Sequence, residues 1–254
     1  MRLMSSQLWI LGLQYERLEA IKPKEALSHR SEDYWQSWER PLSLAERACA
    51  MSHITAWEII AERGSPTLVL EDDALLSRQL KKILSVTSNL GYIDHLTLET
   101  RGRKKLLARE CSERIETRAG VHRFFRLYQD RSGAAAYIVS PEGAKKLLAE
   151  SFFSAGLTDA IICRCRGLRS FQVDPAVAVQ TDKASLYGIK PPVQFKSTIV
   201  NSAREYQGRT YSQFRRRIYA QVLMGLRRLR YAAAERREVR LHSGDFIHLG
   251  LDMS

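Results

Sequence analysis

Long hydrophobic runs are absent from this sequence. No segment approaches the roughly 18 to 20 consecutive apolar residues that a helix needs to cross a bilayer, although 44% of the 254 residues are hydrophobic. Met1 to Leu13 is amphipathic and lacks the apolar core and small-residue cleavage site of a signal peptide. We therefore expect a globular protein with one substantial core that stays in the cytoplasm.

Cysteines are few, and their spacing is not that of a metal site. Cys163 and Cys165 lie one residue apart, with no second pair and no nearby histidine, which is poor spacing for zinc. We expect the four cysteines to be reduced thiols without a metal: Cys49, Cys111, Cys163 and Cys165.

Acidic residues become scarce towards the end of the chain. Residues 204–240 contain eleven arginines, no lysine and three glutamates, so they carry +8 of the formal net charge of +12. Apolar residues recur at helical spacing among these arginines: Phe214, Ile218, Val222, Leu223, Leu226 and Leu229. The pattern predicts a basic amphipathic helix suited to an anionic membrane surface, with a solvated or self-packing helix as the alternative. We expect no nucleic-acid partner, because no DNA- or RNA-binding motif accompanies the charge.

Three adjacent acids follow a short apolar segment near the middle of the chain. Pro66 interrupts what precedes it, Thr67 to Leu70 has the composition of a buried strand, and Glu71, Asp72 and Asp73 come next. Neighbouring carboxylates repel one another, so this pattern favours a bound cation. Mg²⁺ or Mn²⁺ carrying a phosphate-bearing substrate fits, since carboxylates and phosphate oxygens are its usual ligands. A solvated acidic turn before a helix at 74–84 is the alternative.

Strand and helix patterns alternate through the first 190 residues. Ser43 and Glu46 form a capping box for a helix that ends near Gly64. Three aromatic residues in the polar stretch 22–41 are expected to fix that loop to the core. We predict helices at 2–11, 75–90, 142–151 and 160–165, the last capped by Thr158-Asp159, and strands at 13–21, 92–99, 121–128, 134–139 and 171–173. Residues 101–120 show no clear period. The alternation predicts an α/β fold with a mainly parallel sheet flanked by helices.

Two of these segments together resemble a known family. Leu-Ser-Leu-Ala-Glu-Arg-Ala-Cys-Ala-Met-Ser-His-Ile-Thr-Ala-Trp at 42–57, followed by Val-Leu-Glu-Asp-Asp at 69–73, is similar to the signature of glycosyltransferase family 25. That family includes bacterial lipooligosaccharide β-1,4-galactosyltransferases. Weaker similarities follow in order at 133–140, at 144–148, at Thr158-Asp159 and at Pro175 with Gln180. The resemblance covers about residues 2 to 182.

The resemblance implies a GT-A-like nucleotide-sugar transferase over residues 1–190, followed by a basic helical region over 191–254. It implies inversion at the anomeric carbon, Mn²⁺ or Mg²⁺ as cofactor and a UDP-sugar donor, with galactose favoured. The implied acceptor is lipopolysaccharide, lipooligosaccharide or another glycan at the inner face of the bacterial inner membrane. The alternative is a degenerate, non-catalytic member that binds membrane or glycan.

The expected site residues follow from these motifs. We expect Glu71 and Asp73, or Asp73 alone, to bind the metal. For donor binding we expect Ser52, His53, Glu71, Asp72 and Gly133. Inversion by a single displacement also needs a base for the acceptor hydroxyl. Asp159 is our candidate, with Glu99 weaker, and an ordinary helix-capping role is the alternative for Asp159.

One departure from the family pattern concerns the start of the sequence. The family usually opens with a strand of the Val-Ile-Asn-Leu type that helps to bind the nucleotide, whereas this sequence begins just beyond it at Met1-Arg2. Either the start was assigned too late, or part of the uridine pocket is absent. In the second case we expect an unpaired sheet edge and impaired activity.

Overall fold

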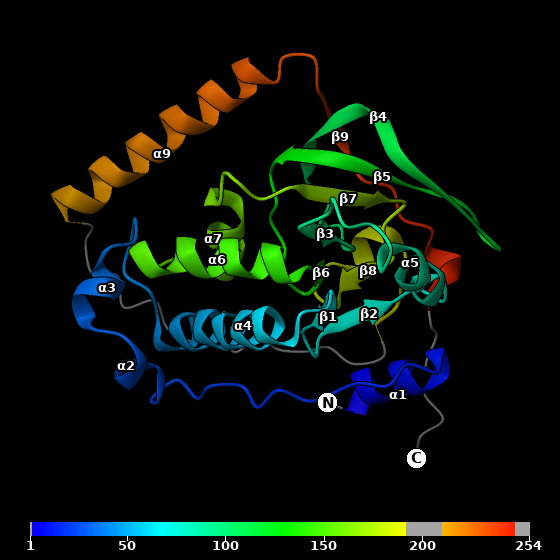
Figure 1. The fold of residues 1–254 in the computed structure, drawn as a ribbon, viewed down its shortest axis with the longest axis horizontal. Helices are drawn as coiled ribbons and strands as arrows, with labels where there is room; N and C mark the ends of the chain where they lie inside the picture. The colour runs from blue at the N-terminus through cyan, green and yellow to red at the C-terminus, as the bar shows by residue number, and fades with distance from the viewer. Residues whose placement is uncertain (1, 192–209, 247–254) are drawn as a thin grey trace.

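The computed structural model describes residues 2–191 and 210–246, which form a mixed α/β structure around a seven-stranded sheet (Figure 1). The strand order is β1 (Thr67–Leu70), β6 (Ala136–Val139), β3 (His95–Thr97), β7 (Ser170–Asp174), β5 (Gly120–Gln129), β4 (Lys104–Thr117) and β9 (Glu235–Glu238). A separate antiparallel pair consists of β2 (Ala74–Leu76) and β8 (Ala178–Gln180).

The prediction of a mainly parallel sheet is wrong. Among the described residues, only β3 and β7 are parallel neighbours in the large sheet, and its other neighbouring strands pair antiparallel. Much of the difference comes from 101–120, where no strand was predicted and β4 lies. One half of β4 is largely exposed and charged, so it lacks the apolar alternation that marks a half-buried strand. Its tight turn into β5 makes that pair antiparallel.

The direction of the central strands determines where the acidic run lies. Both β1 and β3 pair antiparallel with β6, which lies between them, so β1 and β3 run in the same direction. Their carboxyl ends therefore meet at one edge of the sheet. In the part of the chain that the structure describes, β1 pairs with β6 alone, and its outer edge has no partner strand.

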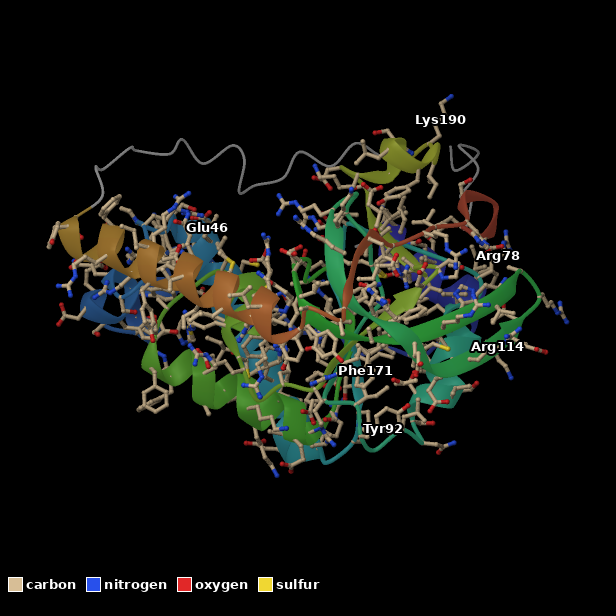
Figure 2. All side chains as sticks on the ribbon, turned by 90° about the horizontal axis from the view of Figure 1, so that it is seen from above. Glu46, Arg78, Tyr92, Arg114, Phe171 and Lys190 are labelled. Atoms are coloured by element: carbon tan, nitrogen blue, oxygen red, sulfur yellow. The ribbon has the colours of Figure 1, made fainter. Side chains whose placement is uncertain are left out.

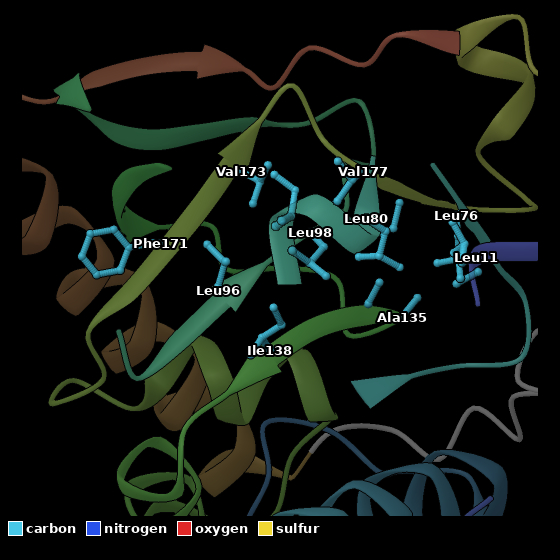
Figure 3. Packing of buried hydrophobic residues seen from close by; sticks show 14 of the residues in the cluster. Leu11, Leu76, Leu80, Leu96, Leu98, Ala135, Ile138, Phe171, Val173 and Val177 are labelled. Carbon is cyan, nitrogen blue, oxygen red and sulfur yellow. The ribbon is translucent and has the colours of Figure 1, made fainter. Parts of the chain in front are cut away.

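Helices cover both faces of the sheet. Alternate residues of β6 face opposite sides, as in any strand: Ala136 and Ile138 join a cluster with α1 and α5, whereas Tyr137 and Val139 join one with α4, α6 and α7. Figure 3 shows the first cluster, where Leu96, Ile138 and Val173 project from neighbouring strands. The helices are α1 (Arg2–Leu11), α2 (Ala26–His29), α3 (Glu32–Gln36), α4 (Leu44–Arg63), α5 (Leu80–Thr87), α6 (Pro141–Phe153), α7 (Thr158–Arg164) and α9 (Tyr211–Arg230), with 3-10 turns at Ala184–Tyr187 and Ser243–Asp245.

Several local predictions are confirmed and others are wrong. The Ser43–Glu46 capping box begins α4, and Gly64 ends it in the left-handed conformation with φ 73°. Trp35 is 1% exposed, so the aromatic stretch is fixed to the core as expected, although it also contains α2 and α3. No strand forms at 13–21. The helix predicted at 75–90 is instead β2 followed by the shorter α5.

The last described segment, 210–246, contains α9 and β9 and contacts the rest of the protein. Tyr231 stacks on Tyr128 of β5 with ring centroids 4.1 Å apart. The buried carboxylate of Asp174 at the end of β7 accepts hydrogen bonds from Arg237 and Arg240. Within 2–191 and 210–246, no helix is both long enough and apolar enough to span a bilayer.

Candidate active site

The acidic run lies at the carboxyl end of β1, held by backbone hydrogen bonds on both sides. The amide of Glu71 donates to the carbonyl of Ala135 at 2.8 Å, and the carbonyl of Asp73 accepts from the amide of Thr181 at 3.0 Å. The loop before β6 and the segment after β8 therefore meet at these acids. Asp72, between them, is exposed.

Both carboxylate oxygens of Glu71 have protein partners. Oε1 lies 3.1 Å from Nε2 of His53, and Oε2 accepts from Nε2 of Gln180 at 3.2 Å. Nδ1 of His53 lies 2.9 Å from the hydroxyl of Tyr137, which also accepts from the indole of Trp57 at 2.9 Å. This buried chain from α4 through β6 fixes the position of Glu71.

The surroundings of His53 shift its pKa upwards. Burial lowers its pKa, but its contacts with Tyr137, Cys49 and Glu71 outweigh burial and raise the pKa well above the ordinary value. A protonated His53 donates from both ring nitrogens and partly neutralises Glu71. Less negative charge on Glu71 leaves Asp73 as the acid with the greater need for a cation.

Asp73 has an oxygen that no described residue satisfies. Oδ2 accepts from Gln180 at 3.4 Å, while Oδ1 is buried and has no hydrogen-bond partner among the residues that the structure describes. Burial, and then repulsion from Glu71 and Asp72, raises its pKa to about 6. A divalent cation would satisfy this oxygen and relieve the repulsion. The site therefore fits a metal ion at Asp73 better than at Glu71.

Glu99 and Gly133 form a second buried contact beside the run. Glu99 is fully buried, and its Oε1 accepts from the amide of Ala135 at 2.7 Å. Burial raises its pKa to about 7. Gly133 has φ +101°, and a Cβ there would lie 2.6 Å from the carboxyl carbon of Glu99. Glycine at 133 is thus needed for the loop to approach Glu99. The side chain of Glu99 has no exposed area that an acceptor could contact.

Asp159 lies in the first turn of α7 and does not cap the helix. Leu157 occupies the cap position without a side-chain hydrogen bond, so the prediction of a Thr158-Asp159 cap is wrong. Burial raises the pKa of Asp159, Arg101 and Arg103 lower it, and Glu71 raises it. The half-buried carboxylate is therefore close enough to Glu71 and to two arginines to interact with them electrostatically.

Ser52 is the predicted site residue whose contacts lead away from the acids. Its hydroxyl donates to the carbonyl of Ala48 and accepts from the amide of Ile21, at 2.9 and 3.0 Å. It therefore attaches the segment after α1 to α4. His53, one residue on, contacts the acidic run directly.

Several site residues were not predicted from the sequence. Gln180 and Tyr137 fall within the weaker similarities to the family, but they were assigned no role because they are distant in sequence from the acids they support. Cys49 was assigned only a structural or incidental role. Its sulfur, a ring nitrogen of His53 and an oxygen of Glu71 lie within 4.8 Å of one another. That softer ligand set would suit zinc better than Mg²⁺, but both nitrogens of His53 already have partners.

Together these features define an α/β protein with carboxylates gathered at a sheet edge, where Oδ1 of Asp73, which has no partner among the described residues, fits a divalent cation. A model of glycosyltransferase family 25, described as LPS biosynthesis protein, matches residues 2–154. Because this match covers more than half of the chain, the chain belongs to glycosyltransferase family 25.

Three individual relatives have sequence identities between 26% and 31%. The lipooligosaccharide biosynthesis protein lic2B of Haemophilus influenzae is 26% identical over 66% of this chain and 66% of its own length. Human procollagen galactosyltransferase 2 is 31% identical over 45% of this chain and 18% of its own. The lacto-N-neotetraose biosynthesis glycosyltransferase LgtE of Neisseria meningitidis serogroup B is 27% identical over 55% of this chain and 51% of its own. The chain thus spans less than two thirds of the length of each of these relatives.

Proposed function

We propose that this protein is an inverting, metal-dependent glycosyltransferase that moves a sugar from a UDP-sugar to a lipooligosaccharide or lipopolysaccharide acceptor. The observation that carries the proposal is Asp73, whose buried, unpartnered oxygen lies in the Glu-Asp-Asp segment of the family motif. Galactose is favoured as the sugar because the human relative is named as a galactosyltransferase. We place the reaction at the cytoplasmic face of the bacterial inner membrane, with a lipid-linked acceptor.

The side chains have distinct roles in this proposal. Asp73 holds Mn²⁺ or Mg²⁺, while Glu71, held by His53 and Gln180, positions the run. When bound, the metal supplies positive charge for the departing diphosphate. Arg101 and Arg103, which interact electrostatically with Asp159, add positive charge near the same acids. Asp159 accepts the proton of the acceptor hydroxyl, and its raised pKa makes it a stronger base than an exposed aspartate.

The proposal is tested by assaying transfer with Mn²⁺, UDP-galactose and a truncated lipooligosaccharide acceptor. We expect Asp73→Ala to reduce kcat/KM by on the order of 100-fold or more, because the diphosphate loses its counter-charge. Asp33→Ala removes an exposed acid from the first turn of α3 and should retain wild-type activity. Equal rates for wild type and Asp73→Ala would contradict the proposal.

The outer edge of β1, which pairs with no strand in the described ranges, favours one alternative, a member that binds a ligand without transferring sugar. In that case part of the nucleotide pocket would be incomplete. Calorimetry with UDP and Mn²⁺ separates the two functions. A catalytic protein should bind UDP only when the metal is present, and Asp73→Ala should abolish that binding. Glycan binding without any UDP binding would favour the alternative.

A further inference from the structure

Helix α9 contacts the body of the protein through one side only. Gln213 is 4% exposed, and Ala220 and Arg227, each seven residues further on, are half-buried. The guanidinium of Arg227 donates to the carbonyls of Cys163 and Arg164 at 2.9 and 3.3 Å. Residues seven apart share one face of an α-helix, so this face lies on the body.

Six of the large apolar side chains of α9 lie on the opposite face. Their successive spacings of three and four residues place them on one stripe, about half a turn from Gln213 and Arg227. Their exposed fractions are: Tyr211 78%, Phe214 52%, Ile218 44%, Val222 53%, Leu226 55% and Leu229 75%. Figure 1 shows α9 along the outside of the molecule, and in the view from above in Figure 2 it lies in front of the other helices.

This orientation is the reverse of the usual one. A surface helix of a globular protein turns its apolar stripe towards the core, whereas α9 turns its stripe to the solvent and an arginine to the body. We name this stripe, together with Arg215, Arg217, Arg228 and Arg230 beside it, the outer face of α9. The described residues of the chain leave this face uncovered.

Positive charge borders the stripe on both sides. Arg217 and Arg228 lie on one flank, and Arg215 and Arg230 lie on the other. All four are exposed, and none forms an ion pair with a residue in the described part of the chain. The helix contains no acidic residue. Apolar side chains between cationic flanks are the pattern of a helix that lies in the plane of a membrane.

We infer that the outer face of α9 is a docking surface for an anionic lipid bilayer. The stripe would enter the boundary between headgroups and acyl chains, and the arginines would meet lipid phosphates. A second copy of the chain fits less well, because two such faces would bring like charges together. A nucleic acid would satisfy the arginines but would leave the stripe in water.

Docking has a geometric consequence for the candidate active site. Arg227 holds the last turn of α7, and Asp159 lies in the first turn of the same helix. Seven residues of α-helix span about 10 Å. A bilayer at the outer face of α9 is therefore separated from the candidate base by the width of α9, about 10 Å, and by the length of α7. A lipid-linked acceptor would reach Asp159 across this distance. This consequence rests on the proposed function, whereas the docking surface does not.

The test is co-sedimentation of the full chain with vesicles of phosphatidylcholine alone or mixed with phosphatidylglycerol. We expect binding to the mixed vesicles, weakening as salt rises. Ile218→Glu with Val222→Glu should reduce this binding by about tenfold or more, because charge enters the stripe. Ser212→Glu with Met224→Glu adds the same charge outside the stripe and should retain most of the binding. All four positions are exposed, so folding should be unaffected.

Several outcomes would overturn the inference. These are no binding of the wild type to either vesicle, equal binding to both compositions, and equal loss in the two double variants. A dimer that forms in solution and is removed by the stripe variant would assign the face to a second copy. Sugar transfer to a soluble acceptor is measured in parallel. The stripe variant should keep wild-type transfer, so failure of docking and failure of the proposed function are told apart.

Discussion

At the scale of single residues, Asp73 shows a conflict between stability and metal binding. Its raised pKa means that the folded state disfavours the charged form, so the protein loses stability as pH rises from the ordinary value towards about 6. We expect Asp73→Asn to increase the unfolding free energy of the metal-free protein at pH 7 by on the order of 1 kcal/mol. Urea denaturation in the presence of a chelator measures this change.

The pH dependence of that gain provides the control. Asp73 takes up its proton as pH falls below about 6, and the wild type then resembles the Asn variant. The difference in unfolding free energy should therefore shrink on acidification. Asp33→Asn, at an exposed position, should change stability little at either pH. A loss of stability in Asp73→Asn at pH 7 would contradict this account.

Gly133 gives a second prediction at this scale. A Cβ at this position would lie 2.6 Å from the carboxyl carbon of Glu99, on a backbone with φ +101°. We expect Gly133→Ala to lower the unfolding free energy by about 2 kcal/mol or more and to displace Glu99. Gly167→Ala is the matched control, since a Cβ there meets no atom within 4 Å. Equal stability of the two variants would disprove the steric argument.

Which site residues could be predicted depended on whether they carry a pattern in sequence. The Glu-Asp-Asp segment and His53 belong to short, specific motifs, and the structure brings them within hydrogen-bond distance. Gln180 contacts the same acids, yet it is brought to them by the pairing of β8 with β2 and by the backbone bond between Thr181 and Asp73. No local rule identifies such a contact, because it depends on tertiary structure. Ser52 shares the motif with His53 but faces the segment after α1.

At the scale of secondary-structure elements, Tyr137 connects β6 to α4. Its hydroxyl is the partner of both the Trp57 indole and Nδ1 of His53, in a fully buried setting. We expect Tyr137→Phe to lower the unfolding free energy by about 2 kcal/mol or more, because the buried indole N–H of Trp57 loses its acceptor and Nδ1 of His53 loses its partner. It should also reduce transfer, since His53 positions Glu71.

Tyr128→Phe is the matched control for this hydroxyl. Tyr128 stacks on Tyr231, and the Phe variant keeps that stacking. Thermal unfolding and transfer rates should both stay near wild type. If Tyr137→Phe also leaves thermal unfolding and transfer near wild type, the connection between α4 and β6 contributes little to stability or to activity.

Element types were easier to predict than their pairing. The capping box and Gly64 set both ends of α4, because caps act through residues close in sequence. Whether neighbouring strands of the sheet run parallel or antiparallel could not be predicted in the same way. Strand β4 is partly polar, and its pairing with β5 and with the distant β9 gives most of the antiparallel character. The segment 13–21 has a strand-like pattern but no partner strand among the described residues, and stays without regular structure.

At the scale of the whole molecule, Arg227 attaches α9 to the body. It donates to two carbonyls at the end of α7. We expect Arg227→Gln to increase hydrogen exchange across 211–230 while leaving the melting temperature of the protein within a few degrees, since few other contacts join α9 to the body. Arg228→Gln, one residue on and exposed, is the control and should exchange like wild type. Unchanged exchange in both variants would show that other contacts hold the helix.

The strand β9 has a consequence for how the protein is made. Lys104 to Leu107 of β4 pair with Glu235 to Glu238, which follow α9 in the chain. During synthesis, that edge of β4 lacks the partner seen in the structure until residues 235–238 have left the ribosome. An edge of unpaired backbone groups can join another strand. A charged side chain at such an edge opposes pairing with a foreign strand, and Lys104 is exposed at the start of the segment that β9 later pairs with.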